Sequence, residues 1–444
     1  MPIFVGNSTV NTAIANSTIT VDQTKNFAYA TSNRNSIRPS LVLDFARSQT
    51  VDPRITFARA SSATYFNSLG VLTTATNNVP RIDYNPSTLV CNGLLIEQAS
   101  TNLITYSGDV STFGTTFSTL TANSATSPDG TTTAALMIPS VDLNNNHYIN
   151  KVWNGSVGNS VTFTISIFAK TAGYQWIRMN PGNAMGGGYC FFDIINGVIG
   201  TYGTVTNPAI QACGNGWFRC SYQFTTAATG TGGIGHQVYA ANSNSGFANW
   251  SGNGTSGYYF WGAQVEQLAF PTSYIATTSA SATRVVDYPQ ISVSSFINPS
   301  SGAFYIECYT NNPPTSGTQG GAFLAQDSSF TSVAVMIYSS LGGFTNYINV
   351  GGTTQLNAGV ASLIGQNIKS GMSYSLLGNS MGAINGTLSS GVATNVSLPV
   401  TTLYLGCSAQ QPTYPGIWNL NGWIRKFAYY PAALSNTELQ TLTS

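Results

Sequence analysis

The segment VTFTISIFAK at residues 161–170 decides the class of fold. Its side chains alternate between apolar and polar, so that Phe163 and Ile165 fall on one face and Thr162 and Thr164 fall on the other. A period of two residues is typical of a β-strand that buries one face and exposes the other. We therefore predict a strand here, with its apolar face in a hydrophobic core.

The same alternation recurs along the chain. It is present at 218–224 and at 258–266, where Tyr259, Trp261 and Val265 are predicted to share the buried face. Gly, Asn and Ser residues separate the alternating segments, and these residues favour turns. Many short strands between such turns are typical of sandwiches, so we predict an all-β protein with β-sandwich, jelly-roll domains.

The composition supports this fold class and excludes several functions. Only 7% of the 444 residues are charged, 12% are aromatic, and the formal net charge is +1. Few Lys and Glu residues are present to favour helices, whereas the aromatic residues are sufficient for large cores. A net charge this small gives no strong attraction for nucleic acid, and no apolar run has the roughly 18–20 residues of a membrane span. We therefore predict no nucleic-acid partner and no membrane insertion.

Six cysteines are scattered over the sequence without a CxxC pair. We expect them to be reduced and buried, which suits folding in the cytoplasm. The first residues, MPIFVGNSTV, contain neither a basic segment nor a long apolar run, so no signal peptide is expected.

Four glycines predict tight turns. Gly70 is expected to close a hairpin, and Gly352 and Gly386 each end a Gly-Gly or Asn-Gly pair that is typical of hairpin turns. Gly93 follows an asparagine, and the same reasoning predicts a turn there.

Charged residues gather near the first of these turns, in a chain otherwise poor in charge. Arg59, Arg81, Asp83 and Glu97 lie in uncharged surroundings. Arginine–carboxylate pairs in such surroundings fix the geometry of loops. We therefore predict that these four residues form a structural charge cluster with no chemical role.

The block that contains these charges resembles a known family. It reads FARASSATYFNSLGVL at 57–72, VPRIDYNPSTL at 79–89 and GLLIEQASTNLI at 93–104. This pattern resembles a block that recurs in virion proteins of tailed bacteriophages, both tail fibres and head spikes, ahead of carbohydrate-binding-module-like and lectin-like β-domains. The matched positions are Phe57, Arg59, Ser61, Ala63, Thr64, Gly70, Val71, Pro80, Arg81, Asp83, Tyr84, Pro86, Gly93, Leu94, Leu95, Glu97, Thr101, Asn102 and Leu103.

Two later regions resemble the domains that follow the block in those proteins. The segments at 216–226 and 258–278 resemble a carbohydrate-binding-module-like domain. The final segment, 421–443, resembles the last strand and terminal helical turn of concanavalin A-like, laminin-G-like jelly rolls. Within it, Ser435 is a predicted N-cap and Glu438 completes a capping box, so a short helix is expected.

These patterns and resemblances predict four parts. They are an N-terminal arm for virion attachment (1–45), a junction block (46–104), a carbohydrate-binding-module-like β-sandwich (105–287) and a concanavalin A-like or laminin-G-like β-sandwich (288–444).

No catalytic motif is present in the sequence. Nucleophilic catalysis needs a base beside the nucleophile, and His147 and His236 are not near a plausible partner. Both histidines are expected at the surface or at a sheet edge. Glu266 and Glu307 lie beside aromatic residues but do not form the carboxylate pair of a glycosidase. We therefore predict no catalytic residues and no enzyme activity.

No metal site is predicted either, because two histidines and dispersed cysteines give zinc no ligand set. We therefore predict no cofactor, with calcium as the one alternative. Side-chain oxygens gather at Asp142 with Asn144–Asn146 and at Asp327, although neither segment is a calcium-binding loop motif.

Aromatic residues in polar loops are the candidates for glycan binding. Faces of aromatic rings pack against the C–H groups of sugars, and nearby amides supply hydrogen bonds. Trp250, between Asn249 and Ser251, is predicted to be exposed. The other candidates are Trp153, Tyr174, Tyr414 and Trp418.

The resemblance implies a non-enzymatic tail fibre or receptor-binding protein that adsorbs to a host surface glycan. It further implies a homotrimer on the virion, assembled in the host cytoplasm and attached through its N-terminal region to a tail adaptor or to the capsid. Two alternatives stay open: a capsid-attached head spike or decoration protein, and a depolymerase that acts on the envelope polysaccharide.

Overall fold

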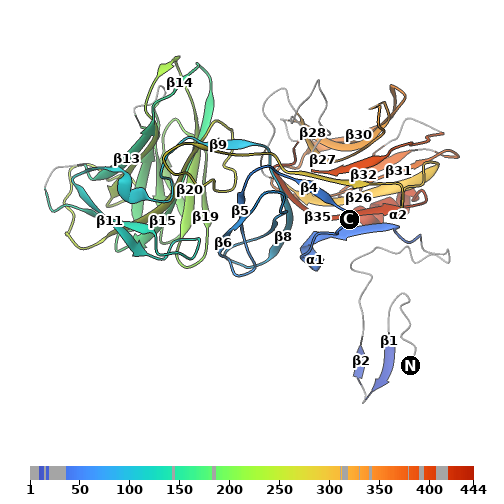
Figure 1. Cartoon of the computed structure of the whole chain (residues 1–444), viewed down its shortest axis with the longest axis horizontal. Coiled ribbons are helices and arrows are strands. Elements are labelled where there is room, and N and C mark those ends of the chain that lie inside the picture. The colour runs from blue at the N-terminus through green and yellow to red at the C-terminus, as the bar shows by residue number, and fades with distance from the viewer. Residues whose placement is uncertain are drawn as a thin grey trace. The chain divides into compact units, whose positions relative to one another are not determined.

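A computed structural model describes most of the chain (Figure 1). The described residues are 10–14, 17–19, 37–142, 146–182, 187–310, 312, 319–329, 331–339, 343–378, 380–389, 395–406 and 419–444.

The predicted all-β class is confirmed, and the chain divides into two compact units. The first, unit 1, is formed by Met1–Phe57, Gly93–Ile96 and Tyr288–Ser444, and the second, unit 2, by Ala58–Asn92 and Glu97–Asp287. Neither helix in the described ranges has the length and hydropathy needed to cross a membrane.

Unit 2 is a sandwich of two antiparallel six-stranded sheets. In the first sheet, here named the front sheet, the strand order is β10 (Gly114–Thr116), β13 (Tyr148–Trp153), β22 (Ile234–Ala241), β16 (Trp176–Asn180), β17 (Cys190–Asp193) and β18 (Val198–Tyr202). In the second sheet, here named the back sheet, it is β11 (Ser118–Ala125), β12 (Ala134–Pro139), β23 (Gly257–Glu266), β15 (Thr162–Ala172), β20 (Phe218–Thr225) and β19 (Thr206–Ala212).

Shorter elements complete unit 2. They are β5 (Ala63–Phe66), β6 (Leu72–Ala75), β7 (Ile82–Tyr84), β9 (Ser100–Asn102), a 3-10 helix (Val110–Thr112), β14 (Ser156–Val157), β21 (Gly230–Thr231) and β24 (Ala282–Arg284).

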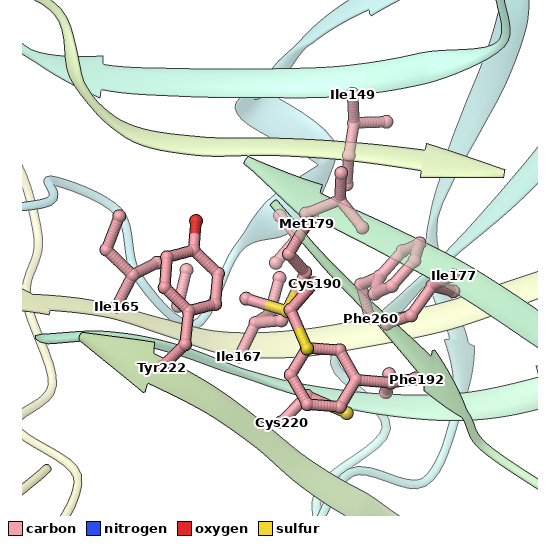
Figure 2. Close-up of a cluster of buried hydrophobic side chains, with 14 of the residues drawn as sticks. Ile149, Ile165, Ile167, Ile177, Met179, Cys190, Phe192, Cys220, Tyr222 and Phe260 are labelled. Atoms are coloured by element: carbon pink, nitrogen blue, oxygen red, sulfur yellow. The ribbon is translucent and has the colours of Figure 1, made fainter. Parts of the chain in front are cut away.

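The core of unit 2 lies between the two sheets and follows from the predicted alternation. Phe163 and Ile165 on β15 are fully buried in it, as predicted. Figure 2 shows Met179, Cys190 and Cys220 entering the same cluster from three different strands. Each large apolar side chain buried in this way contributes about 1.5–3 kcal/mol of transfer free energy.

One predicted buried face is wrong in its first half. Along β23 the side chains of Tyr258 and Phe260, not Tyr259, enter the core with Val265. The alternation of inward and outward side chains shifts at Gly262, which adopts a φ of +63° in a β-bulge. A Cβ there would lie 2.8 Å from the ring of Phe168, so the bulge requires glycine.

Unit 1 is also built from two sheets. One has the order β30 (Thr353–Ser362), β29 (Gly343–Val350), β28 (Val333–Ser339), β27 (Gln319–Gln326), β34 (Thr402–Leu405), β25 (Tyr288–Ser292) and β4 (Thr56–Ala58). The other contains β33 (Thr387–Ser389), β32 (Met381–Ile384), β31 (Asn367–Ser375), β26 (Ser301–Tyr309), β35 (Gly422–Tyr430) and β8 (Cys91–Ile96), and β3 (Leu41–Asp44) also pairs with β35.

Aromatic rings fill the interior of unit 1. The ring centroid of Phe304 lies 5.4 Å from that of Phe323, which in turn lies 5.3 Å from that of Phe427. The helix α2 (Asn436–Thr443) packs Leu439 against another cluster of buried side chains. It begins at Ser435 with the predicted capping box, which is confirmed.

Three short elements at the N-terminal end complete the described structure. The helix α1 (Phe45–Ser48) follows β3, and β1 (Val10–Ile14) pairs with β2 (Ser17–Ile19).

The predicted junction block does not form a separate part. Gly93–Ile96 belongs to unit 1 because β8 pairs with β35, whereas the β5–β6 hairpin packs its Leu72 in a cluster with Trp261 of unit 2. The predicted turn at Gly93 is also wrong, since this residue lies within β8. Its φ is +113°, and a Cβ would lie 2.3 Å from the carbonyl oxygen of Ile424.

The other predicted turns are confirmed. Gly70 closes the β5–β6 hairpin, Gly352 lies between β29 and β30, and Gly386 lies between β32 and β33, each with a positive φ. Part of the predicted arm is a strand, β3, whose Leu41 and Leu43 are buried.

Five of the six cysteines lie in the described residues, and these five are free and buried, as predicted. Burial raises the pKa of the Cys213 thiol to about 12.

Candidate functional site

The residue predicted to be the most exposed glycan contact is buried. Trp250 is 9% exposed and belongs to the core of unit 2, so the predicted exposure is wrong. Its ring meets the rings of His147 and Tyr174 edge-on, at centroid distances of 5.1 Å and 5.3 Å. His147 also holds the loop in place, with Nε2 2.9 Å from the carbonyl oxygen of Trp250 and Nδ1 2.6 Å from that of Phe117.

The other described candidates also contact core side chains. Tyr174 stacks on Tyr258 at 5.6 Å, and its hydroxyl accepts a hydrogen bond from the backbone N–H of Asn253. Trp153 is half-buried, with its ring 6.3 Å from that of Phe163. Tyr414 and Trp418 lie outside the described residues, so their predicted role stays a prediction.

Both histidines are fully buried, and the predicted surface or sheet-edge positions are wrong. His236 lies on β22 between Ile234 and Val238, which are core residues. Burial lowers the pKa of His236 to about 3, so this imidazole is neutral near neutral pH. The backbone of Gln264 offsets this effect of burial only in part.

The charge cluster is buried in unit 2 and contains more residues than the sequence suggested. Arg81 pairs with Glu97 at 2.8 Å, as expected from the sequence. It also pairs with Asp287 at 2.5 Å, and Arg59 binds the other oxygen of Asp287 at 3.0 Å. A third cation, Arg284, lies 2.9 Å from Glu97.

Backbone groups and hydroxyls satisfy much of the remaining hydrogen-bonding capacity. Glu97 accepts both the backbone N–H and the hydroxyl of Ser273, and the backbone N–H of Glu97 donates to Asp287. Burial raises the pKa of Glu97, but Arg284 and Arg81 more than offset this effect and lower it to about 2. Glu97 therefore stays ionised across the physiological pH range, and the cluster joins segments distant in sequence, which is a structural role.

Asp83, the fourth predicted member, accepts hydrogen bonds from the backbone N–H of Phe66 and from Nδ2 of Asn92. Sequence reasoning missed Arg284 and Asp287, which lie at the C-terminal end of the predicted sandwich 105–287. Nothing in their immediate sequence distinguishes them, because the contacts are long-range.

The outer face of the front sheet carries a different constellation. Ile177 on β16 and Val238 on β22 enter the core. Side chains alternate along a strand, so the next residues, Arg178 on β16 and Tyr239 on β22, face outward. The strand register places Tyr148, Tyr239, Arg178 and Phe191 side by side on four neighbouring strands. We name these four residues the aromatic row.

Two further rings cover part of the aromatic row. The guanidinium carbon of Arg178 lies 4.0 Å from the ring centroid of Phe247 and 4.7 Å from that of Tyr189. Under these rings Tyr239 is 8% exposed and Phe191 is 2% exposed, whereas Tyr148 and Arg178 are half-buried.

A row of amides runs beside the aromatic row. Asn150 on β13 pairs with Gln237 on β22, and Gln237 pairs with Asn180 on β16. All three side chains are half-buried, and the described residues offer no hydrogen-bond partner to the amides of Asn150 and Gln237 or to Oδ1 of Asn180. We name these residues the amide row.

The open part of both rows, which we name the binding face, spans three strands. Adjacent strands lie about 4.8 Å apart, and alternate residues on one strand lie about 7 Å apart. The face thus presents aromatic surface, one guanidinium and three amides on a rigid sheet. It consists of Tyr148, Asn150, Arg178, Asn180 and Gln237.

The sequence does contain a signal for the binding face. The segments QWIRMN at 175–180 and GHQVYAA at 235–241 alternate as strands, and their outward positions carry rings, an arginine and amides instead of Ser and Thr. Such outward positions are a better indicator of binding than aromatic residues in loops, because a rigid strand fixes their side chains.

Within the described ranges no group of three or more His, Cys, Asp or Glu side chains lies close enough to hold a metal ion. Asp142 is exposed, and Asn144 and Asn145 lie outside the described residues. Asp327 accepts hydrogen bonds from Thr331 and Ser329 of its own loop. The prediction of no cofactor, with calcium as the one alternative, stays a prediction.

No protein-family model matches the sequence, and neither does any curated protein. Several solved structures are similar in their all-β fold. The native heptameric SAP-like pentraxin from Limulus polyphemus is 15% identical, with 32% of this chain and 70% of that chain covered and a TM-score of 0.25. Domains LG4-5 of the mouse laminin alpha1 chain are 11% identical, with 66% and 85% covered and a TM-score of 0.23.

The CBM22-1–CBM22-2 tandem domain of Xyn10C from Paenibacillus barcinonensis is 10% identical, with 77% of this chain and 99% of that chain covered and a TM-score of 0.22. The chain spans only 26% and 41% of the length of two other matched structures. At these TM-scores the matches carry no information about function.

Proposed function

We propose that this chain is a non-enzymatic binding protein of a phage virion, a tail fibre or receptor-binding protein whose unit 2 adsorbs to a glycan on the host surface. The observation that carries the proposal is the binding face, where half-buried amides and an aromatic ring lie side by side on one sheet.

The chemistry of the binding face suits a sugar. The C–H-rich faces of pyranose rings pack on aromatic rings, and Tyr148 supplies such a ring in contact with Tyr239 at a centroid distance of 4.8 Å. Asn150 and Gln237 can donate to and accept from sugar hydroxyls, because each amide has both functions and neither is used internally by the described residues.

The acids considered for hydrolysis are engaged in other contacts. Glu266 is fully buried and accepts hydrogen bonds from the hydroxyls of Ser100 and Thr272. Glu307 pairs with Arg425 at 3.0 Å in unit 1. Both carboxylates are held by side chains of the protein, which supports a binding role over hydrolysis.

The phage assignment rests on the resemblance of the block between Phe57 and Leu103. On that basis we place the protein on the virion surface, as a homotrimer attached to other virion proteins through its N-terminal region. The composition, with many uncharged polar residues, suits a protein displayed outside the cell.

The experiment measures adsorption of the purified protein to host cells and to the polysaccharide extracted from them. The double variant Asn150→Ala/Gln237→Ala is expected to bind at least about 5-fold more weakly, because two hydrogen bonds are lost. The matched control is Gln211→Ala, which removes an exposed amide from the back sheet and leaves adsorption unchanged. Unchanged adsorption of the double variant would refute the assignment of the binding face.

A further inference from the structure

Arg178 has no counter-ion among the residues that the structure describes. Among the described residues no carboxylate lies within ion-pair distance of its guanidinium, and its Nε is buried without a hydrogen-bond partner. The nearest acid along the sheet, Asp193 on β17, is instead occupied by Gln175 and Asn196. A half-buried positive charge therefore lies on the binding face without neutralisation.

Leaving a cation in this state is costly. Burial disfavours the charge of Arg178 and lowers its pKa, and the four aromatic rings whose centroids lie within 6 Å of the guanidinium carbon offset this only in part. The other arginines of unit 2 that are buried beside carboxylates, such as Arg59 and Arg81, are paired. Arg219, which also has no ion pair among the described residues, donates instead to a backbone carbonyl oxygen and a hydroxyl, whereas the described residues offer Arg178 a single hydroxyl.

The position of the guanidinium favours an oxyanion. The guanidinium packs against the ring of Phe247 at 4.0 Å and donates a hydrogen bond to the hydroxyl of Tyr239, and its other N–H groups are available to a ligand. An arginine held against rings keeps its planar fork in a fixed orientation, and that fork matches a carboxylate or phosphate. Asn180 and Gln237, two residues along from Arg178 and Tyr239, lie where they can bind the hydroxyls of the same sugar unit.

We propose that the ligand of the binding face is an acidic glycan, whose repeating unit carries a carboxylate or a phosphate that pairs with Arg178. This inference rests on the proposed function and specifies the class of glycan. The guanidinium supplies charge and geometry, and the amide row supplies hydrogen bonds to the neighbouring hydroxyls.

The experiment measures the affinity of the full chain for matched polymers. The carboxylate arm uses polygalacturonate, alginate and hyaluronan, each compared with its carboxyl-reduced form, and the phosphate arm uses phosphomannan compared with dephosphorylated mannan. At least one acidic polymer is expected to bind about tenfold or more tighter than its neutral form, and the preference is expected to weaken with added salt. The arm that shows the preference identifies the oxyanion.

Two variants separate charge from packing. Arg178→Met keeps much of the apolar contact with Phe247 and is expected to abolish the preference for the acidic polymer. Arg178→Lys keeps the charge but not the fork, and is expected to retain part of it. Circular dichroism and the melting temperature check that both variants are folded.

The outcomes distinguish this inference from the proposed function. If acidic and neutral polymers bind equally well, or if Arg178→Met keeps the preference, the acidic-glycan inference is refuted. In that case a loss of binding in the Asn150→Ala/Gln237→Ala variant would still support the proposed function. If no polymer binds and host polysaccharide does not bind either, both proposals fail.

Discussion

Replacement of Asp287 by alanine is expected to destabilise unit 2 strongly. Its carboxylate is fully buried and accepts hydrogen bonds from Arg59, Arg81 and the backbone N–H of Glu97. Removing it leaves two buried guanidinium groups without that partner, and breaking a buried pair in this way costs about 3–5 kcal/mol. In a domain of about 150–250 residues, where 1 kcal/mol shifts the melting temperature by about 2–4 °C, the expected loss is roughly 6–20 °C.

Differential scanning calorimetry of the full chain and urea unfolding followed by fluorescence measure this loss. The matched control is Asp109→Asn, because Asp109 is an exposed acid of the same unit, and its effect is expected to stay within about 0.5 kcal/mol. A cost below about 1 kcal/mol for Asp287→Ala would mean that the buried cluster contributes no more than a surface ion pair, and would refute its structural role.

Three further predictions concern residues whose environment the structure defines. The pKa of Glu97 in the folded state is about 2, below its ordinary value, so its stabilising contribution is complete above the unfolded-state pKa and is lost as the pH falls towards 2. The variant Glu97→Gln should therefore lose less stability on acidification than the unmodified protein. An unchanged dependence of stability on acidic pH would contradict this. Ser435→Ala removes the capping box of α2 and should lower the free energy of unfolding of unit 1 by about 1 kcal/mol, as measured by urea titration. An unchanged free energy of unfolding would show that α2 is held by packing alone. Trp250→Ala should lower the free energy of unfolding by about 3–5 kcal/mol because the ring is buried. Tyr202→Ala, which removes an exposed ring of the same unit, should lower it little. Similar melting temperatures for the two variants would contradict the burial of Trp250.

Features set by neighbouring residues were predictable from the sequence. The alternation at 161–170, the hairpin turns at Gly70 and Gly352, and the capping box at Ser435 each depend on a few consecutive side chains. The physical cause is local, so the pattern is complete in the sequence. The fold class followed from the sum of such patterns.

Features that depend on contacts between distant segments were not predictable in the same way. The bulge at Gly262 changes which side chains of β23 face the core, and the ring of Phe168 occupies the space where a Cβ at Gly262 would lie. Nothing in the local alternation of side chains indicates that change. Trp250 lies in a polar segment but is buried because His147, 103 residues away, binds its carbonyl oxygen. The partner of Arg59 and Arg81 is Asp287, about two hundred residues later.

The binding face shows the same limit. Each strand presents its outward residues in the sequence, yet only the strand order β13, β22, β16 and β17 brings Tyr148 beside Tyr239 and Arg178 beside Phe191. Neighbouring strands in this order are not consecutive in sequence, so no short segment of the sequence contains the whole site.

The most direct test of glycan binding by the front sheet is a crystal structure of the protein with an oligosaccharide released from the host surface polysaccharide. We expect the sugar to lie over β13, β22 and β16, with hydroxyls within hydrogen-bond distance of Asn150 and Gln237 and its acidic group against Arg178. A sugar bound to unit 1, or to the back sheet of unit 2, with the binding face empty would contradict the proposal.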